Sequence, residues 1–341
     1  MRTVFEVGEI RAESCQVAKG LLHAGELSDG CTPVSVPVIV MNGTHDGPLL
    51  YLHAGAHGQE TVYAFEVLRR LLFGDLRPED LRGAIVAVPV ANVLAHQAAC
   101  RVSPQYAARE GVPYGGDLHK VWSGDANGSI TQRIAHLLWT QIVHRCDFAI
   151  DYHSVSLPGI PFSFMYRGGK RDAGGTPEWQ RSLQMARAFG VTIVTTAPNP
   201  LTLAGACLDA GKPAFMLEMP APRVHDERAV AVALRGTRNV LVDLGMIEGK
   251  IVPHGDLLVI PGERPALPSV RANRGGIIMF EAECGKLLWA GTVIARTFSM
   301  LGDEVEVIRM PLDGYVMTYP PLSWVGNQSV ATGDLVADIF A

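Results

Sequence analysis

Short apolar runs, many of them rich in β-branched residues, recur along the first 220 residues of the chain. Such runs, bounded by turn residues, are typical of strands that are buried on both faces of a sheet. They predict strands within residues 34–43, 49–55, 84–90, 147–153, 191–196 and 213–219.

Between these runs, apolar residues recur three and four positions apart, which predicts helices. The helical patterns cover residues 60–74, 129–146, 177–190 and 226–245. Ser129 is a candidate N-cap and Gly74 a candidate C-cap. Strands that alternate with helices indicate an α/β domain with helices on both faces of its sheet.

The pattern changes near residue 248. A proline- and glycine-rich segment is followed by short apolar runs separated by turn pairs, and helical periodicity disappears. This spacing is typical of a small all-β domain. We therefore predict two domains, an α/β domain at residues 1–248 and an all-β domain at residues 249–341.

Composition narrows the class of protein. Hydrophobic residues make up 48% of the chain, charged residues 18%, and the formal net charge is −5. Without a basic run, nucleic acid and anionic membranes are poor partners, and a small-molecule substrate is expected. There is no secretory signal pattern and no run of about 20 apolar residues that could span a bilayer. The six cysteines are scattered, which predicts reduced thiols and a cytoplasmic location.

Two potential metal ligands follow the strand at residues 49–55. His57 and Glu60 lie three positions apart at the start of a predicted helix, with small residues that allow a sharp turn. Catalytic zinc sites commonly combine two histidines, one glutamate and an open position. The pair alone also fits an ordinary polar start of a helix. A third ligand is needed to distinguish a metal site from that alternative.

Two other predicted strands end in polar residues. The run at 147–153 carries Asp151 and His153 at its carboxyl end, the edge at which ligands bind in open α/β sheets. His153 is the candidate third ligand, and Asp151 can orient its ring. Glu218 ends another buried strand, where an isolated carboxylate is costly unless it is paired or functional. It is the candidate general base.

In this order, the motifs HGQE, DYH and LEMP resemble those of the succinylglutamate desuccinylase/aspartoacylase family, a branch of the zinc carboxypeptidase-like amidohydrolases. The resemblance covers roughly residues 1–245. It implies a zinc carboxypeptidase-like fold with a mixed, mostly parallel sheet. It also implies His57, Glu60 and His153 as ligands of one zinc ion per chain, and Glu218 as the general base.

The segment between these motifs is similar to the family as well. Arg101 follows Asn92 by nine residues, the family's spacing for the arginine that stabilises an oxyanion. Asp117, Leu118, His119 and Lys120 stand where the family has Asp-Leu-Asn-Arg, a block that binds the substrate. His119 and Lys120 depart from that pattern, and a lysine cannot bind a carboxylate in the bidentate manner of an arginine.

The expected activity is therefore zinc-dependent hydrolysis of the amide bond of a small N-acylated compound. We expect the substrate to be contacted by Asp117, His119, Lys120, Tyr166 and Arg167. Because His119 and Lys120 depart from the family pattern, it stays open whether the substrate carries a carboxylate. A metallocarboxypeptidase or an esterase using the same site, and a non-catalytic binding protein on this fold, remain alternatives. We also expect a homo-oligomer, because the all-β domain has a surface to bury against the α/β domain or a neighbouring subunit.

Overall fold

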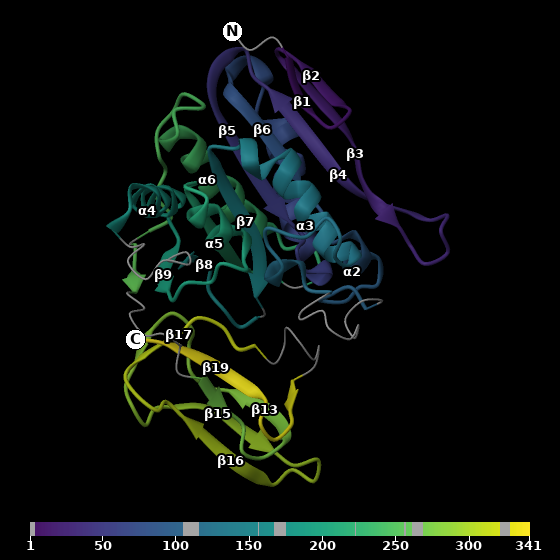
Figure 1. The fold of residues 1–341 in the computed structure, drawn as a ribbon. Helices are drawn as coiled ribbons and strands as arrows, with labels where there is room; N and C mark the ends of the chain where they lie inside the picture. Colours follow the sequence, from purple (N-terminus) through teal and green to yellow (C-terminus); the bar gives the residue numbers. More distant parts are fainter. Residues whose placement is uncertain are drawn as a thin grey trace.

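The structure is a computed structural model. It describes residues 4–104, 116–155, 157–166, 175–221, 223–255, 257–260, 269–320 and 328–341. Figure 1 shows an α/β body that carries the N-terminus and, below it, a smaller body of strands near the C-terminus.

Within the described ranges, the α/β body is built on one mixed sheet of nine strands, ordered β11-β9-β8-β10-β7-β5-β6-β4-β3. The strands at its centre, β10, β7, β5 and β6, run parallel. The strands are β3 (Gln16–Glu26), β4 (Pro33–Asn42), β5 (His45–Ala54), β6 (Arg82–Val88), β7 (Phe148–Val155), β8 (Phe162–Tyr166), β9 (Thr192–Thr196), β10 (Ala214–Pro220) and β11 (Val259–Ile260). The mixed, mostly parallel sheet that the resemblance implied is confirmed.

All six predicted strands are present, as β4, β5, β6, β7, β9 and β10. The apolar pattern did not reveal β3, β8 or β11, nor the N-terminal hairpin of β1 (Val4–Val7) and β2 (Ile10–Glu13). β3 was missed because, apart from the buried Leu22, its residues are exposed or partly buried and form no continuous apolar run.

Helices cover both faces of the large sheet. One apolar core lies between the sheet and α1, α4 and α6, and a second lies between the sheet and α2, α3 and α5. The helices are α1 (Thr61–Arg70), α2 (Val93–Gln97), α3 (Ile130–Gln141), α4 (Pro177–Phe189), α5 (Leu203–Asp209) and α6 (Glu227–Asp243), with short turns η1 (Gly58–Glu60), η2 (Leu71–Asp75), η3 (Pro78–Asp80), η4 (Leu118–Lys120) and η5 (Val143–Arg145).

The predicted helix ends are partly right. Ser129 caps α3 in a capping box with Gln132, which satisfies amide groups that have no partner inside the helix. Gly74 does not end α1. The chain continues through the π turn η2, in which Leu71 and Leu72 are fully buried. Gly74 lies inside this turn, which ends at Asp75.

The C-terminal part is all-β over its described residues, as predicted. Two four-stranded sheets are formed there, ordered β12-β19-β17-β14 and β16-β15-β13-β18. Their strands are β12 (Ser269–Arg271), β13 (Gly276–Phe280), β14 (Leu287–Leu288), β15 (Val293–Phe298), β16 (Glu304–Arg309), β17 (Gly314–Val316), β18 (Ser329–Val330) and β19 (Leu335–Phe340). Because β11 still belongs to the large sheet, the domain boundary at residue 248 stays a prediction.

The all-β domain packs against the α/β domain of the same chain. The Ile160 amide donates a hydrogen bond to the Met317 carbonyl, with an N–O distance of 3.0 Å. Phe162, Met317 and Phe340 are buried together in an apolar cluster that joins the two domains. β17 and β19 lie on the side of the all-β domain nearest the α/β domain (Figure 1). The expected homo-oligomer stays a prediction.

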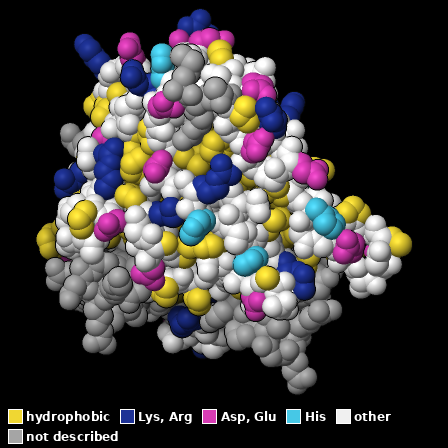
Figure 2. All heavy atoms as spheres, turned by 45° about the horizontal axis from the view of Figure 1, so that its top comes forward, with side chains coloured by type: hydrophobic (Ala, Val, Ile, Leu, Met, Phe, Trp, Pro, Cys, Tyr) yellow, Lys and Arg dark blue, Asp and Glu magenta, His cyan; other side chains and the backbone are white. Residues whose placement is uncertain are grey.

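The face drawn in Figure 2 carries acidic and basic side chains in alternation, with hydrophobic ones between them. No large area of one charge is visible on this face. Among the described residues, no helix is long and apolar enough to cross a membrane. All six cysteines are free.

Candidate active site

His57 and Glu60 lie on the tight turn that joins β5 to α1. Gly55, with a φ of +71°, turns the chain at the end of β5, and η1 carries Glu60 to the start of α1. Gly58 lies directly against α2, where an added Cβ would be 2.0 Å from the carbonyl carbon of Ala95. Only glycine fits at this position, so this close packing fixes where the side chains of His57 and Glu60 point.

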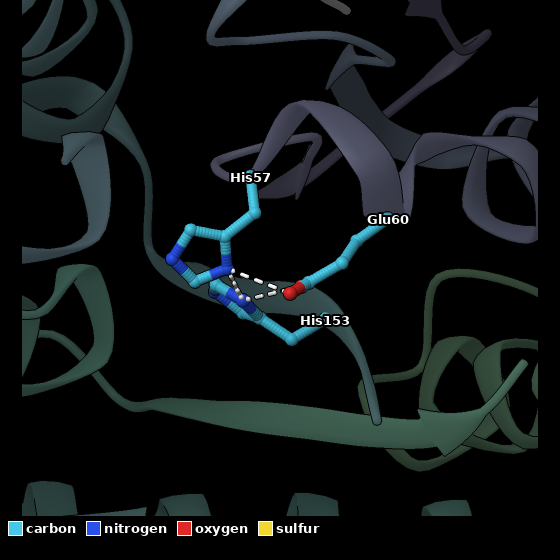
Figure 3. A group of neighbouring side chains, drawn as sticks. All are labelled: His57, Glu60 and His153. Carbon is cyan, nitrogen blue, oxygen red and sulfur yellow. Dashed lines mark hydrogen bonds and ion pairs between the residues drawn. The ribbon is translucent and has the colours of Figure 1, made fainter. Parts of the chain in front are cut away.

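His153 comes from β7, the strand beside β5. The two strands are parallel, so their carboxyl ends meet at one edge of the sheet. The three side chains point toward one another, as Figure 3 shows. His57 Nδ1 is 3.0 Å from Glu60 Oε1 and His153 Nδ1 is 3.2 Å from Glu60 Oε2. The two Nδ1 atoms are 3.2 Å apart.

This group has the donors that a metal ion requires. His57, Glu60 and His153 are buried, and one ligand atom of each lies within 4.8 Å of the others. Burial alone would raise the pKa of Glu60, but the two histidines and Arg101 outweigh it and hold that pKa well below its ordinary value. Two imidazole nitrogens and an ionised carboxylate are a ligand set typical of catalytic zinc.

Each of the two histidines contacts an aspartate through Nε2, the ring nitrogen that faces away from Glu60. Asp117 Oδ1 is 3.2 Å from His57 Nε2, and Asp151 Oδ2 is 3.1 Å from His153 Nε2. When Nε2 donates to a carboxylate, the Nδ1 lone pair is free to bind a metal. The sequence predicted this position for Asp151. For Asp117 it predicted a substrate contact, whereas the structure brings Asp117 to the ring of His57.

Sequence reasoning missed His53. Its Nδ1 is 2.6 Å from Asp151 Oδ1, and its side chain is completely buried. Asp151 therefore bridges two histidines, His53 on β5 and His153 on β7. The available signal was a polar residue inside the apolar run 49–55, the same kind of signal that identified Glu218.

Glu218 lies on β10, directly opposite His153 on the parallel strand β7. Its Oε2 atom is buried and has no hydrogen-bond partner among the described residues. Burial raises the pKa of Glu218 to about 8, helped by the charges of Glu60 and Asp151 and opposed by His153 and Arg101. A carboxylate with a pKa near neutrality can both accept and return a proton.

A cavity of about 160 Å³ adjoins Glu60, Arg101 and Glu218. Nη1 of Arg101 donates to Oε1 of Glu60 over 2.8 Å, so this guanidinium stands beside the metal-binding group. Phe162 and Phe164 from β8 form an apolar wall, and the all-β domain contributes the other side. The cavity therefore combines the candidate base and the arginine with a small apolar space.

The other predicted substrate contacts lie farther from this space. His119 is buried, and its ring centroid is 4.7 Å from that of His153. Burial, with the neighbouring His153 and His57, holds the pKa of His119 well below its ordinary value. Neither His119 nor Lys120 is among the described residues that line the cavity.

Tyr166 stacks on Phe164, with ring centroids 5.8 Å apart, and its hydroxyl is directed to the sulfur of Met216. It is not among the described residues that line the cavity. Arg167, the other predicted contact on this segment, lies outside the described residues.

Comparisons with known proteins agree with this geometry. The catalytic-domain model of the succinylglutamate desuccinylase/aspartoacylase family matches residues 46–244. Over 321 aligned residues the chain is 28% identical to the N-alpha-acetyl-L-2,4-diaminobutyric acid deacetylase of Halomonas elongata. The alignment covers 90% of this chain and 85% of that protein.

Solved structures share the fold. The ectoine utilization protein EutE (DoeB) of Ruegeria pomeroyi superposes with a TM-score of 0.80 at 20% identity, over 99% of both chains. A succinylglutamate desuccinylase/aspartoacylase of Rhodobacter sphaeroides gives 0.78 at 24% identity, over 95% of both chains. A metallo-carboxypeptidase of Burkholderia cenocepacia superposes with a TM-score of 0.50 at 17% identity, over 67% of this chain and 65% of the carboxypeptidase chain.

The fold is thus carboxypeptidase-like, and the match extends across the turn, strands and helices that carry His57, Glu60, His153 and Glu218. From the extent of that match, the chain belongs to the succinylglutamate desuccinylase/aspartoacylase family.

Proposed function

We propose that this protein is a zinc-dependent deacylase that hydrolyses the amide bond of a small N-acylated amino compound. One observation carries the proposal. Glu218, a buried carboxylate with a pKa of about 8, lines the same cavity as Glu60 of the His57, Glu60 and His153 group. A metal-binding group beside a carboxylate that can exchange a proton near neutral pH suits hydrolysis.

One zinc ion per chain would be held by His57, Glu60 and His153. Bound there, it would supply a Lewis acid to the substrate carbonyl and to the attacking water. Asp117 and Asp151 would keep both imidazole rings in the orientation that this binding requires.

The protein's own groups carry the proton and the developing charge. Glu218 takes a proton from the attacking water and returns it to the nitrogen of the departing amine. The Arg101 guanidinium lines the cavity and donates to the carbonyl oxygen as it becomes negative, a contact worth about 3 kcal/mol in the activation barrier. The products are a carboxylate and an amine.

The cavity supports small substrates. At about 160 Å³, it has room for a short acylated amino compound. The Halomonas relative is a deacetylase of an N-acetylated diamino acid. We propose N-acetyl diamino acids as the first substrates to test, together with the matching esters.

The test is Glu218→Gln, assayed for amide hydrolysis and for zinc by elemental analysis. We expect turnover to be lost while about one zinc per chain stays bound, because the glutamine keeps the shape but cannot accept a proton. Glu283→Gln is the matched control, since Glu283 is exposed and pairs with Lys286 on the surface of the all-β domain.

His57→Ala should lose the zinc. Near-normal turnover in Glu218→Gln would refute the role of this base. If the wild-type protein bound no zinc and hydrolysed nothing after zinc was added, the deacylase would be excluded and the binding-protein alternative would lead.

A further inference from the structure

The all-β domain forms one wall of the catalytic cavity. Thr318 and Pro320, which follow β17, line the cavity together with Asp338 and Phe340 of β19. The contact is anchored by the hydrogen bond from Ile160 to Met317 and by a bridge between Gly159 and Thr318. The cavity is therefore shaped by residues nearly 300 positions apart in the chain.

Three phenylalanine rings meet at this wall. Phe162 and Phe164 of β8 have ring centroids 5.1 Å apart, and Phe340 of β19 lies 6.0 Å and 5.8 Å from them. All three line the cavity. Aromatic rings accommodate a short alkyl chain and attract a cation placed within about 6 Å of the ring centre.

Asp338 adds a carboxylate to this aromatic wall. Side chains two positions apart on a strand share a face, so Asp338 and Phe340 face the cavity together, and both line it. Asp338 Oδ1 accepts a hydrogen bond of 2.7 Å from Ser269. Burial raises the pKa of Asp338, and Ser269 and the charge of Arg271 oppose that rise.

The Arg271 guanidinium donates to the Gly333 carbonyl and is not among the described residues that line the cavity. A carboxylate that has lost part of its hydration gains most from a cation that enters beside it. The cavity lining as described has three acidic side chains, Glu60, Glu218 and Asp338, and one basic one, Arg101. Arg101 lies against Glu60, so the described lining near Asp338 has a carboxylate and no basic side chain of its own, and the charge of Arg271 behind it offsets only part of that carboxylate's charge.

We propose that Asp338 and the neighbouring phenylalanine rings bind a protonated amino group of the substrate, so that the enzyme selects N-acylated compounds carrying a second, free amine. This inference rests on the proposed deacylase function. The acylated nitrogen lies toward Glu218 and the metal-binding group, and the free ammonium group lies toward the all-β domain. Asp338 is then a specificity residue contributed by a domain that supplies none of the proposed metal ligands.

The test compares two substrates that differ in one charged group. N-acetyl-2,4-diaminobutyrate carries the second amine, and N-acetylnorvaline has a methyl group in its place. The zinc-loaded wild-type enzyme should prefer the diamino compound in kcat/KM. Asp338→Asn should reduce that preference by about 10- to 100-fold, the usual range for losing a hydrogen bond between charged groups. The asparagine can still accept the hydrogen bond from Ser269.

Asp303→Asn is the matched control, since it removes the same charge from the same domain at an exposed turn. It should keep the wild-type preference. An unchanged preference in Asp338→Asn, with both substrates still hydrolysed, would overturn the role of Asp338 and leave the deacylase standing.

Binding provides a readout that does not need turnover. Calorimetric titration of the zinc-loaded proteins with 2,4-diaminobutyrate should show weaker binding to Asp338→Asn than to wild type, by a similar factor. If no N-acetyl compound is hydrolysed at all, the proposed function fails. Equal affinity of both proteins for the diamine would then refute the Asp338 site as well.

Discussion

Asp151→Asn should weaken zinc binding without changing any metal ligand. Asp151 is buried between two histidines, 2.6 Å from His53 Nδ1 and 3.1 Å from His153 Nε2. Asparagine has the same shape but no charge, and only one of its two terminal atoms accepts a hydrogen bond. It can accept from only one of the two rings, and the negative charge that strengthens the contact with His153 is lost, so the His153 ring is held less firmly.

Loss of such a contact behind a metal-binding histidine typically lowers metal affinity by about 10- to 100-fold, or roughly 1.4 to 2.8 kcal/mol. Competition for zinc against a chelating dye would measure this change. Asp147→Asn is the control, because Asp147 lies just before the opposite end of β7 and accepts from the Leu49 amide. Wild-type zinc affinity in Asp151→Asn would refute the argument that this carboxylate positions the ligand.

Two further predictions concern the base and the turn. In the metal-free protein the raised pKa of Glu218 means that the folded state holds its proton more tightly than the unfolded chain. The free energy of unfolding relative to Glu218→Gln should therefore fall as pH rises from about 4.5 to about 8, measured by urea denaturation; a flat difference would contradict that shift. Gly58→Ala should displace the turn and lose bound zinc, because its Cβ would be 2.0 Å from the Ala95 backbone. Gly74→Ala is the control, because a Cβ added there would have no atom within 4 Å, and this variant should keep its zinc. Equal zinc content in the two variants would contradict the packing argument.

The coming together of His57, Glu60 and His153 could be predicted from sequence because its signals are local. His57 and Glu60 follow one apolar run, and His153 and Glu218 end two others. In a sheet with parallel central strands, the carboxyl ends of those strands meet whatever the details of the loops. The structure bears this out, with Glu218 opposite His153 across β10 and β7.

The role of Asp117 could not be predicted in this way. Its neighbour in space, His57, is 60 positions away, and the contact depends on how η4 folds back over the strand ends. Nothing in the local pattern distinguishes an aspartate that binds an imidazole ring from one that contacts a substrate.

Asp338 was hidden for a similar reason. It is an acid inside an apolar run, a signal that sequence analysis used for Glu218, but its position in the cavity depends on how the all-β domain packs. That packing is fixed by Phe162, Met317 and Phe340. These residues come from distant parts of the chain, and no local pattern connects them.

The wall formed by β19 also has a consequence for how the protein is made. During synthesis, domains generally fold as units with the N-terminal one first. His57, Glu60, His153 and Glu218 all precede the all-β domain in the chain, so we expect them to assemble on the ribosome while the cavity still lacks the side that Asp338 and Phe340 provide. A nascent chain would then leave the proposed zinc ligands open to a metal ion before the all-β domain adds the wall for which we propose a role in selectivity.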